Sequence, residues 1–235
     1  MKKIDLIVGV RPDFIRGAAL RTAFQDFDDK LDLRIIHTGQ HYDPELSQDI
    51  LEQLHLSPIH VYLDVNAVEG VGKMASMMMS YENQIHIDRP DIVIVLGNSD
   101  SALACSMVAA RSHIEVAHID AGVRSYDFQI VEEQNDMLID RLSTYMFTSN
   151  EEPVIPLIRE GYDNSNIIEV GNIRADAVFA NLGFAEDSNA LDRYGLEEGA
   201  YILITLHHDH VLHNRTFLIA FMTMLEKLSE RLRIC

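Results

Sequence analysis

The chain has 235 residues, of which 47% are hydrophobic and 7% aromatic, and its formal net charge is −18 at pH 7. This length allows one large domain, or one domain and part of another. The charge argues against nucleic acid and anionic membrane surfaces as partners, because both would be repelled at long range. The longest apolar runs, such as Ile92–Gly97, fall far short of the ~20 residues that a membrane-spanning helix needs. We therefore expect no nucleic-acid partner and no membrane partner.

The cysteines and the N-terminal segment are typical of a cytoplasmic protein. Cys105 falls in an apolar helical pattern and Cys235 is the last residue, so no disulfide framework is indicated. The N-terminal segment has two lysines and an apolar run, but Asp5 interrupts that run and no small-residue cleavage site follows. We interpret this segment as a first strand and not as a signal peptide.

Apolar runs alternate with segments of helical period along most of the chain. The runs predict strands at Lys3–Val10, Leu31–His37, Ile59–Leu63, Asp91–Leu96, Ile114–Ile119, Tyr145–Thr148 and Ile167–Val170. Helices are expected between them at Phe14–Phe24, Pro44–Leu54, Val68–His86, Ala102–Arg111, Glu132–Leu142 and Glu151–Glu160. Strands that alternate with helices in this way predict an α/β fold with a Rossmann-like, doubly wound parallel sheet.

The composition changes at residues 171–189, where Gly, Asn, Asp and Ala dominate. We expect a domain boundary there, with residues 1–172 forming an N-terminal Rossmann-like domain. A further strand is expected at Tyr201–Leu206 and a further helix at Phe217–Leu232. Residues 173–235 would then be the start of a second Rossmann-like domain, incomplete by itself.

Histidines are dense after the last predicted strand and suggest a zinc site. The cluster contains His208, Asp209, His210 and His213, but no cysteine is near and the spacing does not match the HExxH pattern. We therefore expect no metal. A single histidine at the strand end acting on a ligand is the better hypothesis, because the pKa of imidazole lies near neutrality.

Charged residues gather after the predicted strand Ile114–Ile119. Asp120 ends that strand, Arg124 follows in the turn, and Glu132 and Glu133 enter the next helix. Ligands of open α/β sheets bind outside the carboxyl ends of the strands, so acid, cation and acid at this place are typical of a reaction centre. The alternative is a capped helix and a surface turn with structural ion pairs.

Two other strand ends carry candidate ligand-binding residues. Arg11 lies in a Gly-Val-Arg-Pro turn before a helix, where backbone N–H groups and the helix dipole favour an anion. Arg11 could equally pair with a surface carboxylate. The turn at Gly97–Ser101 is built of small and polar residues, which leave room for a ligand or simply cap the next helix through Ser99 or Asp100.

Seven segments occur in an order that carries a family resemblance: GVRPDFIRGAAL, TGQHYDPELS, VLGNSDSALA, HIDAGVRS, EEQNDMLID, VGNIRADAV and LITLHH. Together they resemble the non-hydrolysing UDP-N-acetylglucosamine 2-epimerase family, from Lys3 to about Arg215. The resemblance implies a GT-B architecture, usually dimeric, with the active site between two Rossmann-like domains. It implies interconversion of UDP-N-acetylglucosamine and UDP-N-acetylmannosamine for surface polysaccharide, with neither a redox cofactor nor an essential metal. The implied mechanism removes the proton at sugar C2, eliminates UDP and adds it back.

The resemblance also implies catalytic roles for individual residues. Asp120 stands where the family has Glu, which keeps a carboxylate but shortens it by one methylene. Glu132 matches the first Glu of the family's PEE segment, and His207 matches the motif histidine that contacts the nucleotide sugar.

Binding roles follow from the same resemblance. The residues expected to bind substrate are Arg11, Arg16, Asn98 and Arg124, of which Arg16 falls where the family usually has Lys. Gln40 and His41 match the segment that helps to hold a second, regulatory UDP-sugar in bacterial members.

Three departures from the family pattern bear on catalysis. Asn98 replaces an Asp, Asp136 replaces an Arg, and the segment after His207 loses the Arg of the family's HRxEN motif. An amide cannot serve as a general base or acid. Family members also continue well beyond the position of Cys235. These departures leave a second hypothesis open, a non-catalytic remnant that acts as a UDP-sugar-binding or regulatory module. Such a module would pair with a full-length family member or form a homo-oligomer.

Overall fold

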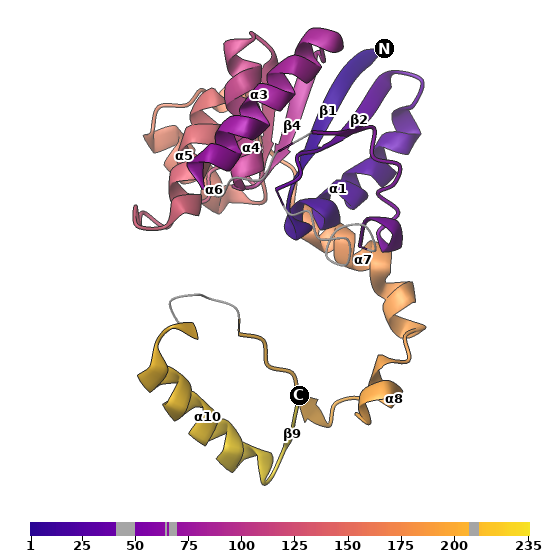
Figure 1. The fold of residues 1–235 in the computed structure, drawn as a ribbon, viewed down its shortest axis with the longest axis vertical. Helices are drawn as coiled ribbons and strands as arrows, with labels where there is room; N and C mark the ends of the chain where they lie inside the picture. The colour runs from indigo at the N-terminus through magenta and orange to yellow at the C-terminus, as the bar shows by residue number, and fades with distance from the viewer. Residues whose placement is uncertain (41–49, 64, 66–69, 207–211) are drawn as a thin grey trace. The chain divides into compact units, whose positions relative to one another are not determined.

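In the computed structural model, a seven-stranded parallel sheet organises the first of two units, Met1–Ala180 (Figure 1). The structure describes residues 1–40, 50–63, 65, 70–206 and 212–235. The strands are β1 Lys2–Val8, β2 Leu31–His37, β3 Val61–Tyr62, β4 Ile92–Leu96, β5 Glu115–Ile119, β6 Tyr145–Thr148 and β7 Ile167–Glu169. Every neighbouring pair is parallel. The α/β, Rossmann-like class predicted from the alternating pattern is thus confirmed.

Helices cover both faces of this sheet, with α3, α4 and α5 on one face and α1 on the other (Figure 1). Their bounds are α1 Arg11–Phe24, α3 Val71–Ile87, α4 Asp100–Arg111, α5 Val131–Leu142, α6 Glu151–Arg159 and α7 Ile173–Glu186. Short 3₁₀ turns at Gln25–Phe27 and Asn164–Asn166 precede β2 and β7. The helix expected at Pro44–Leu54 lies largely outside the described residues.

The two faces of the sheet bury separate apolar clusters, because successive side chains of a strand point to opposite sides. In β4, Val93 and Val95 pack with Tyr81 of α3 in one cluster. Ile94, on the opposite face, packs with Phe14 of α1 in the other. Near-continuous apolar runs are therefore what this sheet requires, since a parallel sheet is buried on both sides.

The strand order is β3-β2-β1-β4-β5-β6-β7, so the chain changes direction across the sheet between β1 and β4. After β1 the chain builds outward through β2 and β3, and it then returns to place β4 on the other side of β1. Open α/β sheets bind ligands at such a switch point, outside the carboxyl ends of the strands. The loops after β1, β4 and β5 are therefore the place to look for a site.

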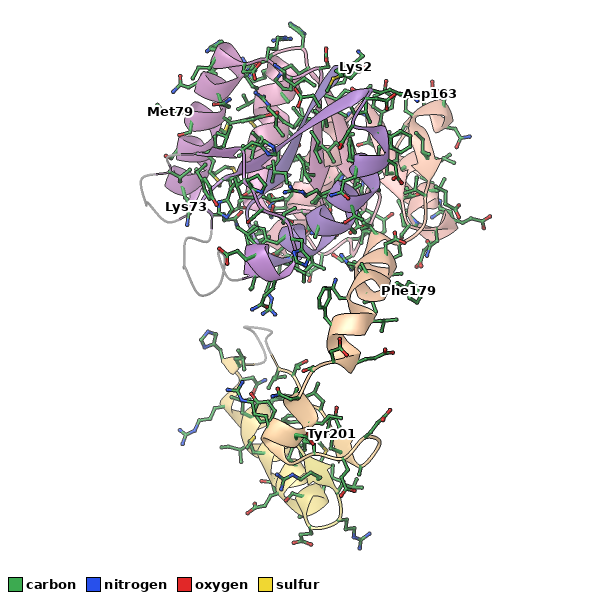
Figure 2. All side chains as sticks on the ribbon, turned by 90° about the vertical axis from the view of Figure 1, so that its right-hand side faces the viewer. Lys2, Lys73, Met79, Asp163, Phe179 and Tyr201 are labelled. Atoms are coloured by element: carbon green, nitrogen blue, oxygen red, sulfur yellow. The ribbon has the colours of Figure 1, made fainter. Side chains whose placement is uncertain are left out.

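Helix α7 occupies the segment in which composition had indicated a boundary. The chain divides between Ala180 and Asn181, inside this helix. Apolar side chains of α7 are exposed, and Phe179, 70% exposed, projects from the helix (Figure 2). The domain limits expected from composition, 1–172 and 173–235, stay a prediction.

The second unit, Asn181–Cys235, is small and contains a βαβ arrangement. Its elements are α8 Ala190–Tyr194, β8 Tyr201–Ile202, α10 Arg215–Ser229 and β9 Arg233–Ile234. β8 and β9 pair in parallel, with Tyr201 opposite Arg233. The strand expected at Tyr201–Leu206 is shorter in the structure, and β9 was not expected. Across the described residues, we find no helix with the length and apolarity needed to span a bilayer.

Candidate functional site

A cavity of about 210 Å³ lies at the switch point of the sheet, where the loops after β1, β4 and β5 meet. α1, the β4–α4 turn, the end of β5, α5 and the first turn of α7 all contribute to its lining. The charged lining residues are Asp13, Arg16, Asp120, Asp136 and Arg174. The cavity therefore combines three carboxylates with two guanidiniums, at the position where the fold predicts a ligand.

Arg16 is the charge around which this cavity is built. Its Nη1 donates to Asp120 Oδ2 at 2.8 Å, and its Nη2 donates to Asp13 Oδ1 at 3.0 Å. Its Nε donates to the carbonyl oxygen of Pro12 at 3.2 Å, and only 5% of the side chain is exposed. Gly97 makes room for it, because a Cβ at that position would collide with the guanidinium and its φ of +61° already favours glycine. Arg16 is thus held in one orientation by partners on three sides.

Asp13 is a site residue that the sequence analysis missed. Its Oδ2 accepts hydrogen bonds from the backbone N–H groups of Gly9 (3.1 Å) and Val10 (3.3 Å) and from Ser99 Oγ (3.3 Å). Burial raises the pKa of Asp13 to about 6, although the neighbouring guanidinium of Arg16 acts in the opposite direction. Val10 is the N-cap of α1, so a carboxylate three residues later reaches back to it as in a capping box. The sequence signal for this role was weak, because a capping box has Ser or Thr at the N-cap and Val10 is neither.

Asp120 joins the two guanidiniums of the cavity. It follows β5 directly, with a φ of +68°, a conformation that Asp tolerates better than most residues. Besides Arg16, Arg174 Nη2 lies 3.3 Å from Asp120 Oδ2. The structure therefore brings together Asp120 and Arg16, which the sequence had indicated separately, and adds Arg174 from α7.

The half-buried Asn98 and the buried Asp136 form a hydrogen-bonded pair on the same cavity. Asn98 Nδ2 donates to Asp136 Oδ2 at 2.8 Å. Asn135 of α5 fixes the β4–α4 turn, because its Nδ2 donates to the Asn98 carbonyl oxygen (3.0 Å) and to Asp100 Oδ1 (3.1 Å). Burial raises the pKa of Asp136 to about 6, with the Asn98 hydrogen bond opposing the shift. Ser99 caps α4 through its side chain, which accepts from the Ala102 N–H, so the capping interpretation of this turn is confirmed.

Arg124 lies outside the cavity lining and holds the scaffold together instead. Its guanidinium bonds to Glu160 through two contacts of 2.9 and 2.8 Å, and its Nη2 lies 2.8 Å from Asp140. Only 1% of the side chain is exposed. In this structure Arg124 therefore lacks a free face for a substrate.

His118 connects Asp140, a partner of Arg124, to Gly97 at the cavity. Asp140 Oδ1 lies 2.6 Å from His118 Nδ1, and His118 Nε2 lies 3.0 Å from the carbonyl oxygen of Gly97. His118 Nε2 donates to the Gly97 carbonyl, which can only accept, and a protonated imidazole would also donate from Nδ1 to Asp140. Burial opposes that charge, yet the Asp140 carboxylate outweighs it and raises the pKa of His118. His118 thereby anchors the glycine that makes room for Arg16.

The predicted residues Glu132 and Arg11 are both exposed and lie outside the cavity lining. The neighbouring Glu133 is buried and accepts from Ser125 N (2.6 Å), Ser125 Oγ (2.8 Å) and Tyr126 N (2.9 Å). Glu133 thus fixes the loop between β5 and α5. The roles of Glu132 and Arg11 stay predictions.

The predicted regulatory segment is described only in part. Gln40 Oε1 accepts from Ser101 N (3.1 Å) and Ser101 Oγ (2.6 Å), which ties this side chain to the start of α4. His41 lies outside the described residues, and so does the predicted catalytic His207. Of the histidine cluster considered for zinc, His213 alone is described. Over the ranges given above, no three His, Cys, Asp or Glu side chains gather to hold a metal ion.

The family model and two related proteins that match this chain are 2-epimerases of UDP-activated sugars. The family model described as UDP-N-acetylglucosamine 2-epimerase matches residues 25–235. The UDP-N-acetylglucosamine 2-epimerase of Methanocaldococcus jannaschii is 32% identical over 216 residues, which cover 91% of this chain and 58% of that protein. The UDP-2,3-diacetamido-2,3-dideoxy-D-glucuronate 2-epimerase of Pseudomonas aeruginosa is 32% identical over 207 residues, covering 87% and 57% respectively.

Solved structures agree with the sequence comparison. The M. jannaschii enzyme in complex with UDP-GlcNAc and UDP superimposes with a TM-score of 0.85 at 30% identity, covering 97% of this chain and 63% of that one. The Rickettsia bellii UDP-N-acetylglucosamine 2-epimerase gives 0.87 at 26% identity, covering 100% and 61%. This likeness confirms the GT-B-type fold, and the chain spans about three fifths of the length of these relatives. With a family model that matches most of its length and relatives above 30% identity, the chain belongs to the UDP-N-acetylglucosamine 2-epimerase family.

Proposed function

We propose that this chain binds a UDP-activated 2-acetamido sugar and takes part in its epimerisation at C2, interconverting UDP-N-acetylglucosamine and UDP-N-acetylmannosamine. The observation that carries this proposal is the cavity at the switch point, where Arg16 and Arg174 converge on Asp120. A volume of about 210 Å³ is below the roughly 300–1,000 Å³ of common ligand pockets, so the cavity accommodates the sugar or the diphosphate and not the whole nucleotide sugar.

The proposed chemistry needs no oxidant or reductant. A base takes the proton from sugar C2, the C–H electron pair forms a C1=C2 double bond, and the C1–O bond to the β-phosphate breaks. UDP leaves with the bonding pair, and it adds back while a proton reaches C2 from the opposite face. Asp120 is the proposed proton-transfer residue, because it is a carboxylate on the cavity. Arg16 and Arg174 are the proposed stabilisers of the charge that develops on the leaving diphosphate.

For the other predicted residues, we propose the roles that the family resemblance implies. Glu132 and His207 would assist catalysis, Arg11 would contact the phosphate end, and Gln40 and His41 would hold a regulatory UDP-sugar. The reaction would take place in the cytoplasm and would supply nucleotide sugar for surface polysaccharide. The chain would act as a homo-oligomer or together with a full-length family member.

A second candidate is a UDP-sugar-binding or regulatory module without turnover. The Asn98–Asp136 pair favours it, since an amide occupies the place at which the resemblance implies a carboxylate. Both candidates bind a UDP-sugar through the same cavity, so they differ in the chemistry that follows binding and not in the ligand.

Proton NMR of UDP-N-acetylglucosamine in D₂O tests the proposal. Incubation with the purified chain should remove the sugar H2 signal as deuterium enters C2, and Asp120→Asn should slow this exchange by about 10²–10⁴-fold. Saturable binding of the ligand with an unchanged H2 signal would support the second candidate. Absence of binding would refute both.

A further inference from the structure

Asp136 is the least satisfied carboxylate of the cavity. Only 4% of the residue is exposed, yet it lines the cavity. Its Oδ2 accepts from Asn98 Nδ2 at 2.8 Å, while its Oδ1 has no hydrogen bond to any residue in the described ranges. Asp13, in contrast, uses both oxygens on four donors of the protein. A buried carboxylate with one unused oxygen at a cavity wall is available to a ligand.

The charges around Asp136 come from every element packed against it. Away from the cavity, the charged or titratable neighbours of Asp136 are His118 of β5, Arg124 of the β5–α5 loop and Asp140 of α5. Asp100 of α4 follows at one remove, through its hydrogen bond with Asn135. On the cavity side lie Asp13 and Arg16 of α1, Asp120 after β5 and Arg174 of α7. With Asp13, Asp120 and Asp136 all ionised, the cavity lining carries one carboxylate more than it has guanidiniums. With Asp136 protonated, the two are equal in number.

We propose that Asp136 is a proton-linked ligand contact, whose neutral acid donates a hydrogen bond from Oδ1 to an oxygen of an anionic sugar diphosphate and whose carboxylate repels that ligand. This inference rests on the proposed function, because it takes the diphosphate of a UDP-sugar as the occupant of the cavity. Asn98 supports the arrangement in both states, since its amide donates to Oδ2 whether or not Oδ1 holds a proton. A protonated acid is also the only form of this side chain that can donate a hydrogen bond.

The direction of the pH dependence follows from linkage. Asp136 has a pKa near 6 in the free protein, and an anion beside it raises that pKa further. The affinity is therefore low and constant well above the bound-state pKa. It rises about tenfold per pH unit between the two pKa values and becomes constant again below about pH 6. Ligand binding is accompanied by proton uptake in the intermediate range.

Calorimetric titration with UDP-N-acetylglucosamine between pH 5.5 and 8.5 tests the inference. This ligand is chosen because its diphosphate diester has no proton to take up in that range. The wild-type chain should bind at least about tenfold more tightly at pH 6 than at pH 8. Asp136→Asn, a neutral isostere, should bind at pH 8 about as tightly as the wild type at pH 6, with a flat profile. Glu151→Gln removes an exposed carboxylate from α6 and should leave the wild-type profile unchanged.

The outcomes separate this inference from the proposed function. Wild-type affinity that is independent of pH would overturn the inference while the UDP-sugar site stands. A pH dependence that persists in Asp136→Asn would assign the titration to Asp13 or His118 and would likewise overturn it. Absence of wild-type binding at every pH would overturn both. If Asp136→Asn fails to fold, ¹³C NMR of the wild-type aspartate carboxyls decides, since the ligand must raise the titration midpoint of Asp136.

Discussion

Replacing Gly97 with Ala probes the close approach on which the cavity depends. The backbone at Gly97 has a φ of +61°, and an L-residue there costs roughly 1–2 kcal/mol. The added Cβ would also collide with the Arg16 guanidinium, which must then shift away from Asp13 and Asp120. Complete loss of one partner of a buried pair costs roughly 3–5 kcal/mol, so a partial displacement should cost about half of that. We expect Gly97→Ala to lower the free energy of unfolding by about 3–4 kcal/mol.

The assay is urea unfolding followed by circular dichroism, and the chain offers a matched control. Gly161 also has a positive φ, +85°, but a Cβ there would meet no heavy atom within 4 Å. Gly161→Ala should therefore cost only the conformational part, roughly 1–2 kcal/mol. The difference between the two variants isolates the collision with Arg16. Equal losses, within about 0.5 kcal/mol, would show that Arg16 can move freely and would refute the reasoning.

Two further predictions concern stability. Glu133→Ala removes the carboxylate that accepts three hydrogen bonds from Ser125 and Tyr126 and should cost about 1–3 kcal/mol in urea unfolding, whereas Glu132→Ala, at an exposed position, should change little. Similar losses in the two variants would contradict the assigned role of Glu133. The raised pKa of His118 means that its contribution is complete below about pH 6.5 and is lost as the pH rises through the folded-state pKa. The wild type should therefore lose more stability than His118→Gln between pH 6 and pH 9, and parallel profiles would refute the protonated imidazole.

Apolar runs predicted the sheet well because a parallel sheet buries both faces of its strands. Ile92–Leu96 illustrates this, since every residue of that run packs into one of the two clusters. Helix α7 was not predicted because its apolar residues form no amphipathic stripe, since Val178 and Phe179 are exposed while the adjacent Ala177 is buried. The two residues of β9 are too few for a periodic signal.

Two signals in the sequence predicted residues of the cavity: a charged residue at a strand end, and the family resemblance. Asp120 was indicated by the first signal, and Arg16 and Asn98 by the second. The burial of Arg124 could not be foreseen, because its partners Asp140 and Glu160 lie far along the chain. Glu132 and Glu133 are adjacent acids, and the rotation of α5 about its axis decides which of them is buried. That rotation depends on packing and is not visible in the local sequence.

Helix α7 belongs to both units of the chain. Its first turn carries Arg174, whose guanidinium contacts Asp120, while its last residues, from Asn181 onward, belong to the second unit. The backbone hydrogen bonds of this helix link each residue to the fourth residue before it, and the chain divides within the helix. One secondary-structure element therefore supplies the second cation of the cavity and begins the second unit.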